Sequence, residues 1–170
     1  MHGANFEFLS EMQNKYPQNF NNCKVLEIGS CTDWNGQPAV FRKYFSNCKY
    51  IGIDLINGTG VDIIVKAQET NFPEKYFDTM ICFSVFEHEP DWRTIISHNL
   101  PFMKNNSMLF LAWGAEGNPR HPPEPWAIVS EQEFLSYIKT LPIKVIESFF
   151  EQTRYKGYVG GAYDAVLKVL

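Results

Sequence analysis

The sequence contains no long apolar run, and its longest uninterrupted stretch of apolar residues is only Met108–Trp113. A membrane-spanning helix needs about 20 such residues. The first residues, Met1-His2-Gly3-Ala4-Asn5, also lack the basic segment and apolar stretch of a secretory signal. These absences predict a soluble, intracellular, cytoplasmic protein with no membrane partner.

Clusters of basic residues are missing as well. The chain has 15 Lys and Arg against 19 Asp and Glu, a formal net charge of -4, and its Lys and Arg residues are scattered. Proteins that bind nucleic acid usually gather Lys and Arg on one surface, because they must neutralise phosphates. The composition therefore argues against a nucleic-acid partner.

Cysteines are few and irregularly spaced. The four cysteines are Cys23, Cys31, Cys48 and Cys82, and successive ones are 8, 17 and 34 residues apart. These separations match neither a zinc site nor the disulfide framework of a small secreted domain. We expect reduced core thiols.

Apolar and aromatic residues, in contrast, are plentiful enough for a sizeable core. They make up 45% and 15% of 170 residues, which excludes global disorder. A chain of this length fits one domain and leaves no room for a second core. We therefore expect a single domain over 1–170, with 1–22 as an N-terminal helical cover.

Apolar segments of strand length alternate with segments of helical spacing along the chain. Strands are expected at 24–29, 49–54, 61–65, 78–84, 107–113, 143–151 and 163–169. Helices are expected at 5–16, after Pro38, from Pro90, and after the capping box Ser130-Glu131-Gln132-Glu133. The four prolines of 114–129 fit no regular element, so this segment is expected to be a loop, ordered or flexible, over the cleft.

This order of elements predicts the fold. Strands alternating with helices favour right-handed crossovers and a parallel sheet covered on both faces. The last two strands share a short glycine-rich link, which favours an antiparallel edge strand. The prediction is an α/β doubly wound, Rossmann-like three-layer sandwich with a mostly parallel seven-stranded sheet and an antiparallel last strand.

Ligands of such sheets bind outside the carboxyl ends of the strands, so motifs there matter most. After the first predicted strand, Gly29 would let the backbone pass close to a ligand, and the following amides could cradle polar atoms. Cys31 stands where a G-x-G-x-x-G motif has its second glycine, which weakens a pyrophosphate-binding interpretation. Asp54 ends the second strand, where a carboxylate can accept both hydroxyl hydrogens of a ribose. A ribose-bearing ligand without pyrophosphate fits both motifs, and S-adenosylmethionine is such a ligand.

The same stretches resemble the class I S-adenosylmethionine-dependent methyltransferases, especially small proteins with a type 11-like methyltransferase domain. The matching segments are VLEIGS (25–30), YIGIDL (50–55), GVDIIVKAQETNFPEKYFDTMICFSVFEHEPDW (60–92) and MLFLAW (108–113). The resemblance implies a cofactor site in which Glu27, Gly29 and Ser30 approach the methionine part and Asp54 holds the ribose. It further implies that Leu55, Ala67 and Gln68 line the adenine and that Ser84 to His88 border the methyl group and the acceptor.

Methyl transfer is an in-line displacement, so the protein mainly positions the acceptor and excludes water. A hydroxyl acceptor would profit from a general base, and His88 and His121 are the candidates. His88 could equally be a capping or core histidine. His121 lies in the proline-rich segment, which could form an acceptor pocket with Trp126 as its wall or serve as a rigid surface connection.

The leading hypothesis is a methyltransferase for a small-molecule or glycan acceptor. Enzymes that methylate exocyclic amines of nucleic acids favour an Asn/Asp-Pro-Pro-aromatic signature after the fourth strand, where this chain has Ser84-Val85-Phe86-Glu87. A non-catalytic S-adenosylmethionine-binding or degenerate partner subunit is the alternative. A nicotinamide-dependent oxidoreductase would share Asp54 but lacks its glycine pattern. The sequence indicates no oligomeric state.

Overall fold

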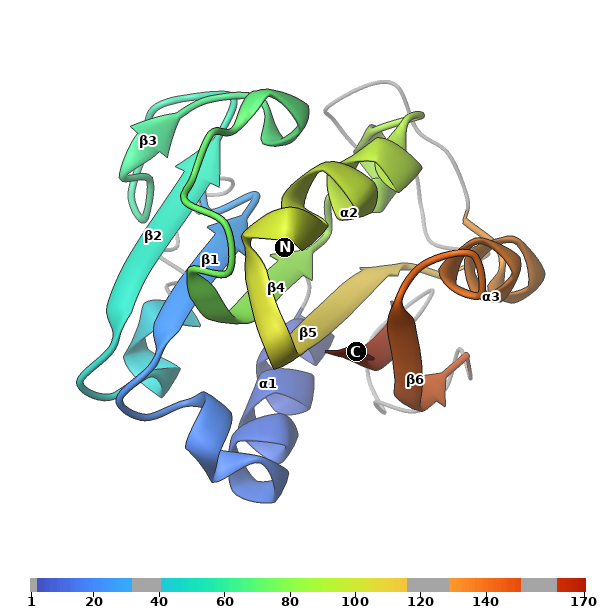
Figure 1. The fold of residues 1–170 in the computed structure, drawn as a ribbon, viewed down its shortest axis with the longest axis horizontal. Helices are drawn as coiled ribbons and strands as arrows, with labels where there is room; N and C mark the ends of the chain where they lie inside the picture. The colour runs from blue at the N-terminus through green and yellow to red at the C-terminus, as the bar shows by residue number, and fades with distance from the viewer. Residues whose placement is uncertain (1–2, 32–40, 116–128, 151–161) are drawn as a thin grey trace.

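Seven strands form one sheet in the order β3-β2-β1-β4-β5-β7-β6 (Figure 1). The structure is a computed structural model, and it describes residues 3–31, 41–115, 129–150 and 162–170. The strands are β1 (Lys24–Ile28), β2 (Lys49–Asp54), β3 (Ile63–Ile64), β4 (Phe77–Phe83), β5 (Met103–Gly114), β6 (Ile143–Phe149) and β7 (Ala162–Val169). β1 to β5 pair in parallel, whereas β7 runs antiparallel to both of its neighbours. The predicted mostly parallel sheet with an antiparallel last strand is confirmed.

The expected place of the antiparallel strand at the edge of the sheet is wrong. β7 lies between β5 and β6, and β6 forms the edge. Burial explains this order, because β7 is buried at every residue except the half-buried Lys168, whereas Ile143 is the one buried residue of β6 and its other residues are half-buried or exposed. The more apolar strand takes the interior position.

Helices cover both faces of the sheet. On one face, α2 (Trp92–Asn99) and α3 (Glu131–Ile138) pack against alternate strand residues such as Met80 and Cys82. On the other face, α1 (Gly3–Lys15) and the 3-10 helix Phe41–Tyr44 pack against the intervening residues such as Ile81 and Phe83. Because both faces are buried, the strands are almost continuously apolar. The predicted three-layer arrangement is confirmed.

Several predicted boundaries shift. The third strand shortens to Ile63–Ile64, an edge strand whose two residues are both exposed. α2 begins at Trp92 instead of Pro90, because Asp91 takes the N-cap position and its Oδ1 accepts a hydrogen bond from Thr94 Oγ1 at 2.7 Å. The helix expected after Pro38 is described only over 41–44, where it is a 3-10 helix.

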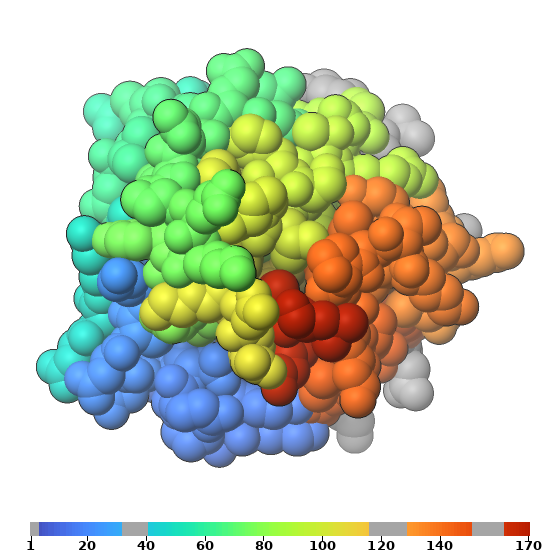
Figure 2. Space-filling view, viewed as in Figure 1, coloured from blue at the N-terminus to red at the C-terminus, as the bar shows by residue number. Residues whose placement is uncertain are grey.

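The capping box before α3 forms in part. Ser130 Oγ accepts from the Glu133 amide at 3.3 Å, as predicted, but the Glu133 carboxylate pairs with Arg93 at 2.5 Å. This ion pair joins α3 to α2. In the space-filling view, α2 forms the centre of one face of the molecule, with α3 on one side of it and the segment that follows β3 on the other (Figure 2).

All four cysteines are free, and Cys23, Cys31 and Cys82 are buried. Cys48 is only half-buried, so the prediction of a core thiol holds for three of the four.

Within the described ranges, the structure contains no helix whose length and apolar character would let it cross a membrane.

Candidate functional site

The carboxyl ends of β1 and β4 meet at Gly29. This glycine has a φ of +78°, and its amide and the Ser30 amide both donate to the carbonyl of Ile53 at 3.0 Å. A Cβ atom at Gly29 would lie 2.3 Å from Val85 Cγ2. Only glycine therefore combines this turn with such a close approach to the segment after β4.

Asp54 ends β2 beside this turn. Its Oδ2 accepts from the Cys31 amide at 2.8 Å, and its Oδ1 accepts from the Ile56 amide at 3.3 Å. An ionised carboxylate has about four lone-pair positions, so the half-buried side chain keeps acceptor capacity for further donors. The carboxylate is thus oriented by the backbone and still able to bind hydroxyl groups.

Glu27 lies deeper, on the same sheet face as Asp54. It is 3% exposed, and its Oε2 accepts from the Tyr50 hydroxyl at 2.7 Å. Burial raises the pKa of Glu27 to about 8, against the opposing effects of the Tyr50 hydrogen bond and the positive charge of Arg42. The carboxyl group is therefore mostly protonated at neutral pH.

Arg42 and Asp62 complete this charged group. The Arg42 guanidinium pairs with the Asp62 carboxylate and lies 4.8 Å from the centroid of the Tyr50 ring. Asp62 Oδ2 also accepts from the Gly52 amide at 2.7 Å. Sequence reasoning missed Tyr50, Arg42 and Asp62, because none of them stands in a strand-end motif.

Ser30 is fully buried against β2. A Cβ atom at Gly52 would lie 2.2 Å from the Gly60 carbonyl oxygen and 2.8 Å from both Ser30 Cβ and Ser30 Oγ, so the missing side chain makes room for the Gly60 backbone and for Ser30. Ser30 Oγ has no hydrogen-bond partner among the residues that the structure describes.

Leu55, Ala67 and Gln68, the predicted adenine contacts, have different surroundings. Leu55 follows Asp54 and is 63% exposed, which leaves an apolar side chain open beside the carboxylate. Ala67 and Gln68 belong to a 3-10 helix held by α2, since the Ala67 carbonyl accepts from Asn99 Nδ2 at 2.8 Å. Gln68 Nε2 is buried and lacks a hydrogen-bond partner within the described ranges.

Ser84 follows β4 with a φ of +55°. Its Oγ accepts from Asn5 Nδ2 at 3.0 Å, and Asn5 is 1% exposed. This hydrogen bond ties α1 to the carboxyl end of β4. Sequence reasoning missed Asn5. Its position was a usable signal, because Asn5 precedes Leu9 by four residues and Met12 by seven, which places a polar amide within the apolar stripe of a helix.

Glu87 and His88 end the short helix Phe86–His88 behind Ser84. Glu87 is fully buried, and its carboxylate oxygens make no hydrogen bond of normal geometry to a described residue. Burial raises the pKa of Glu87 to about 7, although the nearby amides of Glu87 and Gly114 lower it. His88 is half-buried. His121 lies outside the described residues, as does most of 114–129.

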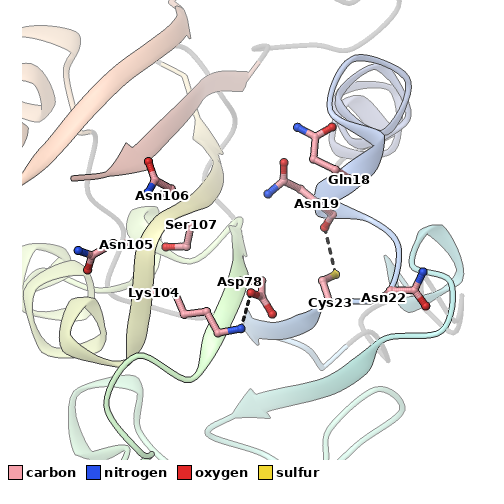
Figure 3. A pocket seen from close by; sticks show the side chains of 9 residues that line it. All are labelled: Gln18, Asn19, Asn22, Cys23, Asp78, Lys104, Asn105, Asn106 and Ser107. Carbon is pink, nitrogen blue, oxygen red and sulfur yellow. Dashed lines mark hydrogen bonds and ion pairs between the residues drawn. The ribbon is translucent and has the colours of Figure 1, made fainter.

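A polar cavity of about 180 Å³ lies at the opposite end of the sheet, by the amino ends of β1, β4 and β5 (Figure 3). Its wall includes the ion pair of Asp78 Oδ1 and Lys104 Nζ at 2.6 Å. None of the predicted site residues within the described ranges lines it. The cavity is therefore distinct from the predicted cofactor site.

Comparison with known proteins finds a match at the level of structure only. No protein-family profile matches the sequence, and no curated protein matches it either. Among solved structures, the 1,6-didemethyltoxoflavin-N1-methyltransferase of Burkholderia thailandensis superimposes with a TM-score of 0.69 at 12% identity, over 95% of this chain and 76% of that one. The N-methyltransferase NodS of Bradyrhizobium japonicum has a TM-score of 0.66 at 14% identity, over 96% and 97% of the two chains. The fold is that of the class I S-adenosylmethionine-dependent methyltransferases.

The methyltransferase fold does not by itself decide the reaction. The cyclase SpnF is similar with a TM-score of 0.72 at 12% identity, over 96% of this chain and 80% of that one. Within this methyltransferase fold, Gly29, Ser30, Asp54 and Ser84 come together at the carboxyl ends of adjacent strands. The side chains at this edge must therefore carry the functional argument.

Proposed function

We propose that the protein is an S-adenosylmethionine-dependent methyltransferase that acts on a small-molecule or glycan acceptor. The observation that carries the proposal is the carboxylate of Asp54, oriented by the Cys31 amide at 2.8 Å beside the Gly29 turn. This arrangement offers two acceptor oxygens for a ribose diol at the carboxyl end of β2.

The surrounding residues fit this cofactor. Ser30 Oγ and Gln68 Nε2 are buried polar atoms without partners in the described part of the chain, so they could hydrogen-bond to a cofactor. Exposed Leu55 would support an adenine ring, and buried Glu27 would lie near the positively charged methionine part. Ala67 and Gln68 would border the adenine edge.

When bound, the cofactor supplies a methyl group on a positively charged sulfur, and its transfer depends mainly on positioning. The chain contributes that positioning through Asp54 on the ribose and Glu27 on the amino group. Ser84, whose hydroxyl accepts from Asn5, would lie beside the acceptor. His88 would accept the proton of a hydroxyl acceptor while the methyl group leaves the cofactor sulfur for the acceptor oxygen, and His121 is the second candidate for this role.

Two observations support a small acceptor. The Burkholderia thailandensis methyltransferase was solved with 1,6-didemethyltoxoflavin and S-adenosylhomocysteine bound. In addition, the chain has scattered Lys and Arg residues and a net charge of -4, which disfavours a nucleic-acid acceptor.

One observation favours a second candidate, a non-catalytic S-adenosylmethionine-binding partner subunit. Cys31 places a buried side chain, 4% exposed, in the turn at the position where glycine lets a ligand approach. Such a domain would bind the cofactor but transfer no methyl group.

Calorimetry with S-adenosylhomocysteine tests the cofactor proposal. Asp54→Ala removes two charge-assisted hydrogen bonds to the ribose, so affinity should fall about 100-fold or more, at about 1.5–3 kcal/mol per bond. Glu74→Ala, which removes an exposed carboxylate, is the matched control and should bind as the wild type does. Equal affinities of the wild type and Asp54→Ala would remove Asp54 from the site, and thermal stabilisation by NAD alone would favour the oxidoreductase.

Turnover distinguishes the two remaining candidates. Release of S-adenosylhomocysteine should be measured with small-molecule and glycan acceptors, and His88→Ala should lower kcat for a hydroxyl acceptor. Tight binding without turnover across these acceptors would support the non-catalytic subunit.

A further inference from the structure

Cys23 and Cys48 stand opposite each other immediately before β1 and β2. The isolated bridge Asn21↔Ser46 and the strand pair Lys24↔Lys49 share an offset of 25 residues, which is also the separation of the two cysteines. Hydrogen bonds from the Asn22 amide to the Ser46 carbonyl at 3.0 Å and from the Lys49 amide to the Cys23 carbonyl at 2.9 Å fix this register. The backbone therefore holds the two cysteines as a directly facing pair.

The two thiols are already in contact. Their Sγ atoms are 3.0 Å apart, and the Cys23 amide donates to Cys48 Sγ at 3.4 Å. Neighbouring strands lie about 4.8 Å apart, which falls within the Cα separations of about 4.4–6.8 Å that disulfides accept. A bond of about 2 Å needs the sulfur atoms to approach by only about 1 Å.

The surroundings give the two thiols different roles. Cys23 is 6% exposed, borders the polar cavity at this end of the sheet and donates to the Asn19 carbonyl at 3.2 Å (Figure 3). Burial and the contact with Cys48 raise the pKa of Cys23 well above its ordinary value. Cys48 is half-buried and can meet a small oxidant, whereas Cys23 is placed to attack only its neighbour.

We propose that Cys23 and Cys48 form an oxidation site, closed to a reversible disulfide by exchange with a small disulfide such as oxidised glutathione. The Cys48 thiolate attacks one sulfur of glutathione disulfide and releases one glutathione thiolate. The Cys23 sulfur, as it loses its proton to solvent, then attacks Cys48 Sγ and displaces the second glutathione. Two protein thiols are oxidised, one disulfide is reduced to two thiols, and an excess of reduced glutathione reverses both steps.

Intact-mass spectrometry after thiol labelling tests this proposal. The folded protein is incubated in glutathione buffers from fully reduced to fully oxidised, then quenched and labelled with N-ethylmaleimide in denaturant. We expect four labels in the reduced protein and two in the oxidised protein, whose unlabelled mass falls by about 2 Da. Peptide mapping should show Cys23 linked to Cys48, with Cys31 and Cys82 labelled.

Single variants separate the two roles. Cys23→Ser should accumulate a glutathione adduct of about 300 Da on Cys48, and Cys48→Ser should keep all three remaining labels. Cys31→Ser is the matched control and should lose two labels as the wild type does. If a variant fails to fold, the wild-type peptide map alone decides the outcome.

Several results would overturn the proposal. Four labels in wild-type protein under fully oxidising conditions would show that the pair does not close. A lasting glutathione adduct in the wild type would show that Cys23 does not resolve it. Loss of label from Cys82, which is 1% exposed, would place the oxidation in unfolded molecules.

Discussion

Glu27 and Glu87 should make the protein less stable as the pH rises from about 5 to 8. Both carboxyl groups are buried, with pKa values raised from 4.5 to about 8 for Glu27 and to about 7 for Glu87. The unfolded chain ionises each group near pH 4.5, whereas the folded chain keeps the proton until the pH exceeds the raised pKa. Between these values the folded state binds more protons, so the free energy of unfolding falls with increasing pH.

The loss of stability for each glutamate follows from the pH interval between its pKa in the unfolded chain and its raised pKa in the folded chain. One pH unit of unequal protonation changes stability by about 1.4 kcal/mol. The interval of about 3.5 units for Glu27 gives at most about 5 kcal/mol, and that of about 2.5 units for Glu87 gives at most about 3 kcal/mol. Stability contributed by each neutral carboxyl is fully present below pH 4.5 and lost above its raised pKa.

Glu27→Gln and Glu87→Gln isolate these contributions, because glutamine resembles the protonated carboxyl and does not ionise. Urea unfolding at pH 5, 6, 7 and 8 should give similar stabilities for wild type and variants at pH 5. By pH 8 each variant should be more stable than the wild type, with the larger gain at Glu27. Wild-type and variant stabilities that stay parallel over this range would refute the reasoning.

Two further substitutions test the packing of the site. Gly29→Ala should cost about 2–3 kcal/mol of stability in urea unfolding, because it combines a left-handed backbone with a contact of 2.3 Å to Val85 Cγ2. Adding Val85→Ala should recover the part of the loss that is due to the contact. No recovery would show that the contact contributes nothing to the loss. Asn99→Ala should cost about 1–2 kcal/mol by the same assay, because it removes the two buried hydrogen bonds of the amide with the Ala67 carbonyl and the Thr70 hydroxyl, which keep only their bond to each other. A loss below about 0.5 kcal/mol would show that water replaces the amide.

Much of the fold could be predicted because it depends on local patterns. The run Met80-Ile81-Cys82-Phe83 is apolar at every position, as a parallel strand buried on both faces requires, and the structure buries all four residues. Strand ends could be predicted for the same reason, which places Asp54 and Gly29 correctly. The order of β6 and β7 could not be predicted, since a hairpin pattern does not specify which strand faces β5.

The contacts within the site were beyond sequence reasoning because they join distant residues. The hydrogen bond between Asn5 and Ser84 spans 79 residues, and that between Tyr50 and Glu27 spans 23. The role of Gly52 was also hidden, because a glycine inside a strand gives no sign that it accommodates Ser30 from the neighbouring turn.

The charges around the Gly29 turn bear on the choice between the two cofactor classes. Glu27, Asp54 and Asp62 lie on one face of the sheet, and each of the other two carboxylates raises the pKa of Glu27. Arg42 is the positive group among them, and it is already paired with Asp62. A pyrophosphate at this turn would be repelled by the Asp54 carboxylate, whereas an ammonium and a sulfonium group would stabilise the ionised form of Glu27. Binding of such a cation at pH 7 should therefore release a proton from Glu27, and the heat of binding should depend on the ionisation enthalpy of the buffer.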